Sequence, residues 1–533
     1  MRILITLFVK LLAPTAKKFF QALKEPQAAQ QAVQKQIFSR LANSEYGKSL
    51  GIQSIADWTA IPIVEYEDIE KWIFRQKHSK NPILTPEPIL FYEKTSGSRG
   101  PAKLIPYTKS LRRSFNQMFC VWAHDLILHG PAFSTGKIYF CISPQIGGSA
   151  TTEQGVAVGL EDDSEYLDGW LRWFLTFFLV SPAGINRLSC AQKFKEILSQ
   201  ALLLEENLEI ISIWSPSFLK VLLDYIQEHQ TRLSEELATK MSPSRKALLL
   251  EPEIPWTRVW PQLKFISCWD SAASADRAQF LQSLFPGVMV QGKGLLATEA
   301  PMTIPLIKAQ GCVPVLDEVF FEFEDKQGKI HLLHELETGG VYEIILSQKG
   351  GLYRYRIGDR VRVSHYYLAT PCLEFLGRDR AISDMVGEKL HSEFVGEAID
   401  GLALEGTSFK SLVPAKTPID RYILLLDTAN VPDVAIAREL DDALMRSPHY
   451  RQARLLGQLS EVRVLVSRQI PDILTAYKTQ SGIKWGDIKH QLLVTTPIEE
   501  ELLAELEKVS ATKKKDLNHD YTNHQTTTNW AAL

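Results

Sequence analysis

The chain has 533 residues, 45% of them hydrophobic and 23% charged, and its formal net charge is −3. This length predicts at least two domains, and the composition is typical of a soluble globular protein. The nearly balanced charge and the absence of a long basic stretch argue against a nucleic-acid-binding protein. The cysteines are scattered without CxxC spacing, which indicates reduced, mostly buried thiols in a cytoplasmic protein. They are Cys120, Cys141, Cys190, Cys268, Cys312 and Cys372.

The first twenty residues begin with an apolar run, which Lys10 interrupts well short of a membrane span. One interpretation is a signal peptide, with Arg2 as its basic region and a cleavage site near residues 13–16. We favour an amphipathic helix that packs on the body of the protein, because the helical pattern continues to Leu41 without a change in character. Weak attachment of such a helix to a membrane surface stays open.

Residues 17–50 continue this helical pattern, which stops near Gly47 and Gly51. Residues 61–72 predict a turn that leads into a short helix. The next feature, residues 91–108 (FYEKTSGSRGPAKLIPYT), places hydroxyls and glycines between two apolar runs and predicts a loop between strands.

This loop has the chemistry to hold a triphosphate. Glycines let backbone N–H groups approach an anion, the hydroxyls add donors, and Lys103 adds a positive charge. It is not a Walker A loop, because Lys103 is followed by Leu104 instead of Ser or Thr. The alternative interpretation is an ordinary polar hairpin turn that contains one lysine.

After the loop, Thr108 is expected to cap a helix that runs through Leu126, and residues 137–142 predict a buried strand. Residues 166–180 (YLDGWLRWFLTFFLV) contain six aromatic side chains. An aromatic stripe at helical spacing is more often part of a core than of a binding site. It is also the best candidate for one wall of an organic substrate pocket.

From Glu209 onward, strands and helices alternate. The expected strands are residues 210–214, 263–269 and 288–291, and the expected helices are residues 217–229 and 276–284. This order predicts a largely parallel sheet that is covered on both faces. Ligands bind beyond the carboxyl ends of such strands, where Ser271 and residues 292–299 would lie.

Residues 313–363 change to short strands with glycine turns, which predicts an antiparallel, barrel-like subdomain. Its expected strands are residues 318–324, 330–333, 341–346 and 353–363. The segment His331–Glu335 is not an HExxH motif and reads as strand, so a metal hydrolase is a poor interpretation. The expected domains are therefore residues 1–377, a smaller α+β domain at 378–510 with strands at 420–426 and 461–466, and a disordered tail at 511–533.

Four further stretches carry chemistry, although each has a plainer explanation. Thr298–Glu299 combines a hydroxyl with a carboxylate that can hold magnesium, or it is a solvated strand-end loop. Asp359 follows a glycine and can accept ribose hydroxyls, or it belongs to a simple turn. Arg378 and Lys389 flank the expected hinge, or they are solvated surface charges. Lys489 could swing over an α-phosphate, or it is an ordinary surface lysine.

Taken together, these stretches resemble the adenylate-forming superfamily, and within it the GH3-type acyl acid amido synthetases and their bacterial relatives. The resemblance covers roughly residues 25–500. Each motif is weak alone, but five of them occur in order at sensible separations. They are TSGSRGPAK, GLLATEA, GGLYRYRIGDRVRV, FLGRDRAISDMVGEKL and WGDIKHQLL.

The resemblance implies an α/β adenylate-forming fold, with a large N-terminal domain and a smaller, mobile C-terminal domain. It also implies a nucleotide-binding set of residues: Thr95, Ser96, Gly97, Ser98, Gly100 and Lys103 in the phosphate loop, Ser271, Thr298, Glu299 as the magnesium ligand, Asp359 at the ribose, Arg378 at the hinge and Lys389 near the nucleotide. Lys489 is the implied catalytic lysine of adenylation.

The sequence departs from the family pattern at several positions. Arg99 stands where a hydroxyl is usual, and it is given no role here. The usual hinge aspartate falls near Ala381, which GH3-like members also lack. The proline expected shortly after the adenylation lysine is Gln491, so Lys484 is a rival to Lys489.

The implied activity is ligation in two steps. ATP and Mg²⁺ would convert a carboxylic acid into an acyl-adenylate, and an amine, expected to be that of an amino acid, would then form an amide. The alternatives are an acyl-CoA ligase of the same superfamily and a non-catalytic nucleotide-binding homologue. The expected partners are the acid and the amine, with no nucleic acid and no stable membrane insertion, for a monomeric cytoplasmic protein.

Overall fold

A computed structural model describes most of the chain, namely residues 1–79, 81–94, 103–140, 150–151, 156–158, 167–182, 184–185, 188, 190–271, 275–378, 382–386, 388–404, 406–416, 420–428, 433–455, 458–481, 483 and 488–510. The chain divides into two compact units. The first unit comprises Met1–Arg378 together with Lys484–Asp487, and the second comprises Asp379–Ile483 and the residues from Ile488 onward. The expected tail at 511–533 lies outside the described residues.

The N-terminal segment folds as two helices, α1 (Arg2–Ala22) and α2 (Pro26–Ala42), followed by the short α3 (Glu45–Ser49). The prediction of one continuous helical pattern from residue 17 to 50 is therefore wrong. Pro26 lacks an N–H and occupies the first turn of α2, which separates that helix from α1. One face of α1 is buried through Phe8, Leu12, Ala16 and Phe19, as expected for an amphipathic helix that packs on the body.

The predicted loop at 95–102 lies outside the described residues, but the strands on both sides of it are present. β1 (Ile89–Lys94) and β2 (Leu104–Thr108) pair antiparallel in a sheet of order β2-β1-β5-β4. The Thr108 hydroxyl accepts a hydrogen bond of 3.2 Å from the Leu111 N–H and caps α5 (Lys109–His129), as predicted. The other elements here are η1 (Ile55–Ala60), α4 (Tyr66–Lys77), β4 (Ala150–Thr151) and β5 (Ala157–Val158).

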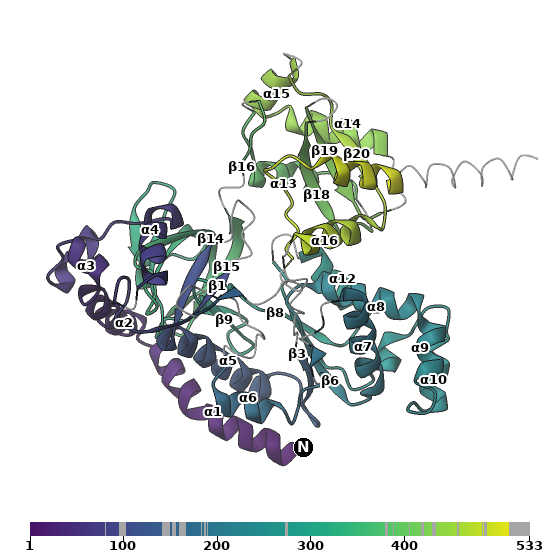
Figure 1. The fold of residues 1–533 in the computed structure, drawn as a ribbon, viewed down its shortest axis with the longest axis horizontal. Coiled ribbons are helices and arrows are strands. Elements are labelled where there is room, and N and C mark those ends of the chain that lie inside the picture. Colours follow the sequence, from purple (N-terminus) through teal and green to yellow (C-terminus); the bar gives the residue numbers. More distant parts are fainter. Residues whose placement is uncertain are drawn as a thin grey trace, which may run out of the picture. The chain divides into compact units, whose positions relative to one another are not determined.

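The predicted parallel sheet is confirmed in the first unit (Figure 1). Its strands pair in the order β3-β6-β7-β8, and every residue of β6 and β7 is buried, so both faces of the sheet are covered. The strands are β3 (Lys137–Phe140), β6 (Leu208–Ser212), β7 (Phe265–Cys268) and β8 (Met289–Gly292). The helices that follow β3 in the chain are α6 (Gly169–Leu175), α7 (Ala191–Leu204), α8 (Pro216–Glu228), α9 (Gln230–Glu236), α10 (Pro243–Leu249), α11 (Trp256–Val259) and α12 (Ala275–Leu284).

The aromatic stretch around α6 is divided between the core and the surface. The Phe174 ring stacks on the Phe8 ring of α1, with ring centroids 4.9 Å apart and planes 10° apart. Phe178 is also buried in the same cluster. The remaining aromatic side chains of α6 and the turn after it, Trp170, Trp173 and Phe177, are exposed. The core interpretation therefore holds for Phe174 and Phe178 and fails for the three exposed aromatic side chains.

The predicted antiparallel subdomain forms a five-stranded sheet of order β12-β11-β13-β14-β15, with a separate β9–β10 pair. Its last strand, β15, was not predicted, because Pro371, Glu374 and Gly377 interrupt any strand pattern in that segment. β15 instead gains its pairing from the long β14, across the turn at Leu368. The strands are β9 (Thr303–Leu306), β10 (Gly311–Pro314), β11 (Phe320–Glu324), β12 (Ile330–Leu332), β13 (Val341–Ser347), β14 (Tyr355–Tyr367) and β15 (Thr370–Arg378), and the short η5 is Leu333–Glu335.

The second unit is built on a three-stranded sheet in which β18 pairs antiparallel with β19, and β19 pairs parallel with β20. β19 and β20 correspond to the two predicted strands. Across the described residues, no helix combines the length and the apolarity needed to cross a membrane. The elements are β16 (Ile382–Ser383), β17 (Leu390–His391), α13 (Ser392–Asp400), β18 (Lys410–Ala415), β19 (Arg421–Leu426), α14 (Asp433–Leu444), α15 (Pro448–Leu455), β20 (Arg463–Val466), α16 (Ile470–Gln480) and a helix at 500–510.

Candidate functional site

The chain leaves the predicted phosphate loop through a strand that is fixed to α4. Thr95, Ser96, Gly97, Ser98 and Gly100 lie outside the described residues. The Lys103 Nζ lies 3.3 Å from Glu67 Oε1 and 5.0 Å from the centroid of the Tyr66 ring. The Leu104 N–H donates to the Tyr66 hydroxyl at 2.9 Å, and burial raises the pKa of that hydroxyl. An exposed ion pair such as Lys103–Glu67 is worth little, so the ammonium can exchange it for a phosphate.

The Thr298–Glu299 motif forms a tight turn that is attached to the same strand. The Ala297 N–H donates to the Ala300 carbonyl at 3.2 Å, which closes the turn. The Tyr107 hydroxyl of β2 donates to the Thr298 carbonyl at 2.6 Å. Glu299 is only 6% exposed, so its carboxylate does not belong to a solvated loop. Two predicted motifs that are widely separated in the sequence therefore meet at β2.

The Gly350–Gly351 turn reaches β2 as well. A Cβ added to Gly350 would lie 3.2 Å from the Pro106 carbonyl oxygen, tighter than most real contacts, so this turn packs directly against the strand. Gly351 has φ of +118°, a conformation that side chains rarely adopt, and a Cβ there would lie 3.1 Å from Leu84. The two glycines therefore allow the third motif to approach β2 closely.

Arg354, just after this turn, anchors it through a buried ion pair that the sequence did not reveal. Its Nε and one terminal nitrogen donate to the two carboxylate oxygens of Glu322, both at 2.9 Å. The other terminal nitrogen donates to the carbonyls of Thr59 at 3.1 Å and Ile61 at 2.7 Å. Arg354 and Glu322 are 5% and 3% exposed, and Arg354 has φ of +46°. The hydrogen bonds that the guanidinium donates to Glu322 and to the two carbonyls hold this unusual backbone conformation.

Asp359, the predicted ribose carboxylate, lies on β14 and is 2% exposed. In the register of the β14–β15 pair it stands opposite Arg378, the predicted hinge arginine. Arg378 is also the residue at which the chain first leaves the first unit. The register thus brings two predicted site positions onto neighbouring strands.

In the second unit, Lys389 is exposed and has φ of +45°. Its neighbour Glu388 is fully buried, and its carboxylate accepts hydrogen bonds from the Met385 N–H at 2.9 Å, the Val386 N–H at 2.8 Å and the Tyr422 hydroxyl. The alternative for the stretch around Lys389 was a surface turn with solvated charges. This alternative fails for Glu388, whose carboxylate is buried. Its buried carboxylate fixes the segment that presents Lys389.

Lys489 is exposed, although the backbone on both sides of it is anchored in the core of the second unit. Ile488 and His490 are 3% and 8% exposed, and the His490 ring meets Phe409 edge to face with centroids 5.2 Å apart. The Lys489 carbonyl accepts a hydrogen bond of 2.9 Å from the Lys478 Nζ. A fixed backbone with an exposed lysine is suited to present that lysine to a partner. The rival, Lys484, lies outside the described residues.

Lys293 lies just after the carboxyl end of β8, within the segment 292–299 that was expected beyond the strands, although the sequence did not single it out. Its Nζ donates to Ser212 Oγ at 2.8 Å and to Ser267 Oγ at 3.4 Å, at the ends of β6 and β7. It also lies 5.0 Å from the centroid of the Trp214 ring. A single lysine after a strand carries no sequence signal, so only the parallel topology could have indicated it.

Asp270 and the half-buried Ser271 follow β7 at the same edge of the sheet. A Cβ on Gly292 would lie 2.2 Å from the Asp270 carboxylate, so only glycine leaves room for that carboxylate. Desolvation raises the pKa of the Asp270 carboxyl, although the residue as a whole is exposed, and backbone hydrogen bonds partly oppose the shift. The edge therefore combines a lysine, a carboxylate and an indole ring.

Within the described ranges, no group of three or more His, Cys, Asp or Glu side chains could hold a metal by itself. His331 instead pairs with Asp325 at 2.8 Å. Glu299 and Thr298 supply oxygen donors only, and Mg²⁺ commonly binds through one or two carboxylates together with substrate phosphates and water. The donor set at this turn therefore fits Mg²⁺ shared with a phosphate.

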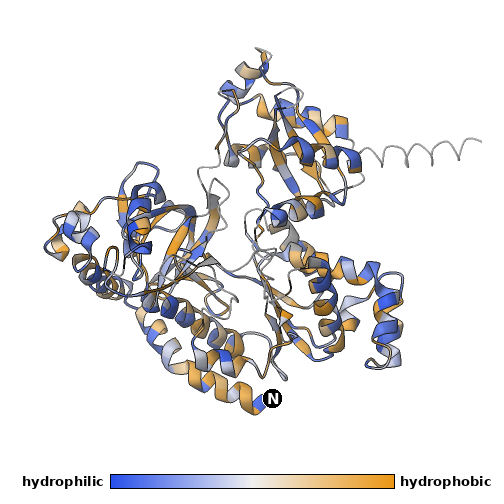
Figure 2. Ribbon diagram, in the orientation of Figure 1, coloured by the Kyte–Doolittle hydropathy of each residue, from blue (hydrophilic) through white to orange (hydrophobic). Residues whose placement is uncertain are grey.

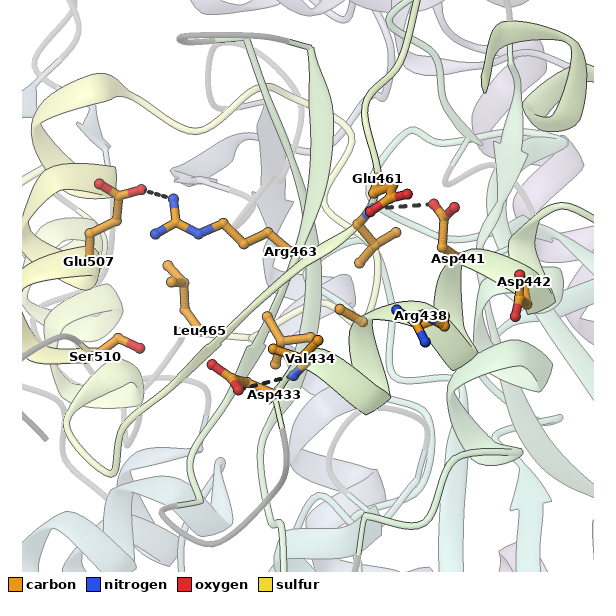
Figure 3. A pocket seen from close by; sticks show the side chains of 13 residues that line it. Asp433, Val434, Arg438, Asp441, Asp442, Glu461, Arg463, Leu465, Glu507 and Ser510 are labelled. Carbon is orange, nitrogen blue, oxygen red and sulfur yellow. Dashed lines mark hydrogen bonds and ion pairs between the residues drawn. The ribbon is translucent and has the colours of Figure 1, made fainter. Parts of the chain in front are cut away.

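A separate hollow of about 550 Å³ lies in the second unit, between α14, β20 and the helix at 500–510 (Figure 3). Two interactions lie within its polar wall: Arg463 meets Glu507, and the Val462 N–H donates to Asp441. None of the predicted site residues lines it. Among the predicted residues of the first unit, Lys103 and Thr298–Glu299 lie at β2, Asp359 and Arg378 lie on β14 and β15, and Ser271 lies beyond β7.

The sequence matches the GH3 family N-terminal domain over residues 15–290 and the GH3 family central domain over residues 312–378. Indole-3-acetic acid-amido synthetase GH3.4 of Arabidopsis thaliana is 23% identical, with 86% of this chain and 88% of that protein covered. Indole-3-acetic acid-amido synthetase GH3.8 of Oryza sativa subsp. indica is 23% identical over 70% of each chain.

Two solved structures share the fold. AtGH3.15 acyl acid amido synthetase in complex with 2,4-DB superimposes with a TM-score of 0.80 at 20% identity, covering 94% of this chain and 96% of its own. The 2-hydroxyisobutyryl-CoA ligase in the postadenylation state has a TM-score of 0.50 at 12% identity, covering 91% of this chain and 92% of its own. The predicted adenylate-forming fold is confirmed by these similarities. Since the N-terminal match alone spans more than half of the chain, this protein belongs to the GH3 family.

Proposed function

We propose that this protein is an ATP-dependent acyl acid amido synthetase. It activates a carboxylic acid as an acyl-adenylate and transfers the acyl group to an amine, in our proposal that of an amino acid. The observation that carries the proposal is the family match over both the N-terminal and central domains, together with relatives named amido synthetases that align over most of the chain. The attachment of the Thr298–Glu299 and Gly350–Gly351 turns to β2 supports it.

The first step joins the acid to AMP. A carboxylate oxygen attacks the α-phosphorus of ATP, the bond to the β-phosphate oxygen breaks, and pyrophosphate leaves. The enzyme's task is to hold these groups in line and to offset the charge that develops. We assign phosphate binding to the loop, Lys103 and the Thr298 hydroxyl, and ribose binding to Asp359. The further nucleotide contacts are Ser271, Arg378 and Lys389.

Mg²⁺, bound at Glu299, would neutralise phosphate charge. Lys489 is the residue we assign to the α-phosphate. In the second step the amine nitrogen attacks the activated carbonyl carbon, the bond to AMP breaks, and the nitrogen loses a proton. No protein nucleophile is needed, because AMP is already a good leaving group. The chain's own residues bind, orient and neutralise charge in both steps.

We place the acid at the carboxyl edge of the parallel sheet, beside Lys293 and Trp214. Lys293→Met should then raise the KM for the acid by about ten- to a hundredfold, since one charged hydrogen bond contributes roughly 1.5–3 kcal/mol. The KM for ATP should not change. Steady-state kinetics with each substrate varied in turn would measure both values. An equal rise in the two KM values would contradict this placement.

The proposed function is tested by screening carboxylic acids for ATP-dependent pyrophosphate release, crossed with amino acids and with CoA. An amide product with an amino acid supports the proposal. Consumption of the adenylate by CoA alone would instead identify an acyl-CoA ligase. ATP binding without pyrophosphate release for any acid would favour a non-catalytic nucleotide-binding homologue.

A further inference from the structure

The helices α1 and α6 expose large apolar side chains. On α1, Ile3, Leu7 and Leu11 are 85%, 46% and 47% exposed. Their spacing of four residues places them on one face of the helix, turned away from the buried Phe8 and Leu12. The N-terminal end of the helix is correspondingly hydrophobic in Figure 2.

The second half of this surface comes from α6 and the turn after it. Trp170, Trp173 and Phe177 are 44%, 63% and 41% exposed, and the Trp173 and Phe177 rings meet edge to face with centroids 5.1 Å apart. The stacked rings of Phe8 and Phe174 fix the two helices against each other. We call the six exposed side chains the α1–α6 surface: Ile3, Leu7, Leu11, Trp170, Trp173 and Phe177. Large exposed apolar side chains on two helices that pack against each other are typical of an interaction site.

The charged residues of α1 are all basic, whereas α6 is preceded by Asp168, which pairs with Arg112 at 3.6 Å. α1 contains no Asp or Glu, and its basic residues Arg2, Lys10, Lys17 and Lys18 are all exposed. Arg172 on α6 is exposed too. An acidic run, residues 161–165, precedes α6 in the sequence but lies outside the described residues, so the electrostatic argument rests on α1. Apolar side chains with tryptophans and flanking lysines are typical of helices that lie in the interface of an anionic membrane.

We propose that the α1–α6 surface docks this protein on an anionic phospholipid bilayer. At 1.5 Å per residue, α1 is about 31 Å long and would lie flat on the membrane, and no described helix is suited to span it. Ile3, Leu7 and Leu11 precede the family match, which begins at residue 15, whereas the aromatic side chains of the surface lie within it. The proposal does not depend on the amido synthetase activity.

The test is sedimentation of the full-length protein with vesicles of phosphatidylcholine and phosphatidylglycerol, and with vesicles of phosphatidylcholine alone. The wild type should bind the mixed vesicles more tightly. The triple variant Ile3→Gln, Leu7→Gln, Trp173→Gln should lose at least about tenfold in partition coefficient, because three apolar anchors are removed. A second variant, Lys10→Gln with Lys17→Gln, should reduce the preference for the anionic vesicles and leave binding to phosphatidylcholine unchanged.

A matched control changes three exposed apolar side chains elsewhere: Phe74→Gln, Leu250→Gln and Leu455→Gln, which are 62%, 44% and 75% exposed in the wild type. The control should bind like the wild type, and equal melting temperatures would establish that all variants are folded. Three outcomes would overturn the proposal: no vesicle binding by the wild type, equal losses in the control, or a dimer without vesicle binding that only the triple variant dissociates. The last outcome would assign the surface to a second copy of the chain.

Discussion

Substitution of Lys489 by alanine should abolish acid-dependent exchange of pyrophosphate into ATP while leaving ATP binding largely intact. The reason is that an ammonium aimed at the α-phosphate stabilises charge that exists mainly in the transition state. Loss of one such donor typically costs about a hundredfold or more in rate. Because the backbone is anchored at Ile488 and His490, the truncation should not disturb the fold. Isotope exchange measures the rate, and equilibrium binding of ATP measures the affinity.

Two comparisons make this result specific. Lys508→Ala, on the exposed side of the helix at 500–510 in the same unit, should retain the wild-type exchange rate. Lys484→Ala tests the rival lysine directly. If Lys484→Ala lost exchange and Lys489→Ala did not, the adenylation role would pass to Lys484. Unchanged exchange in both variants would remove this segment from the mechanism.

The largest expected effect on stability comes from Arg354→Met. After the substitution, the buried Glu322 carboxylate keeps the hydrogen bond of 3.2 Å from the Trp58 indole N–H. It loses the ion pair with the guanidinium. Breaking a buried ion pair from one side costs about 3–5 kcal/mol. Two backbone carbonyls, of Thr59 and Ile61, also lose their donor. Urea denaturation, followed by a probe in the first unit, should show a midpoint shifted to a much lower concentration.

The control for this prediction is a second arginine–glutamate pair in the same sheet. Arg362 donates twice to Glu374, at 3.1 and 3.0 Å, but the two side chains are 47% and 51% exposed. Arg362→Met should therefore cost less than about 1 kcal/mol. The double variant Arg354→Met with Glu322→Gln should recover part of the loss, since no buried charge remains unpaired. Equal costs for Arg354→Met and Arg362→Met would contradict the importance of the buried pair.

Much of this fold follows from local signals in the sequence. Thr108 followed by an apolar periodic segment predicted the cap of α5, and alternating strands and helices from Glu209 predicted the parallel sheet. The motifs also predicted candidate site residues. Two motifs, the phosphate loop with its exit strand and the Thr298–Glu299 turn, are joined through the Tyr107 hydroxyl. These successes share one cause: the responsible residues are close in sequence, or their order follows a general topological rule.

The remaining features depend on distant pairing that one sequence does not display. β15 is a strand because β14 offers it partners, despite a proline and a glycine in its sequence. Arg354 is important because Glu322 and two carbonyls near residue 60 surround it in the folded chain. Lys293 lies beside Trp214 only after the parallel strands are aligned. In each case a common residue type acquires its role from neighbours supplied by tertiary structure.

The pairing of Asp359 with Arg378 has a practical consequence for protein engineering. β15 ends at Arg378, where the chain first passes from the first unit into the second. A one-residue insertion or deletion within β15 would turn all its following side chains to the opposite face of the sheet. Chimaeras that exchange the C-terminal portion between relatives should accordingly be spliced after residue 378, which preserves the donor scaffold's last strand intact.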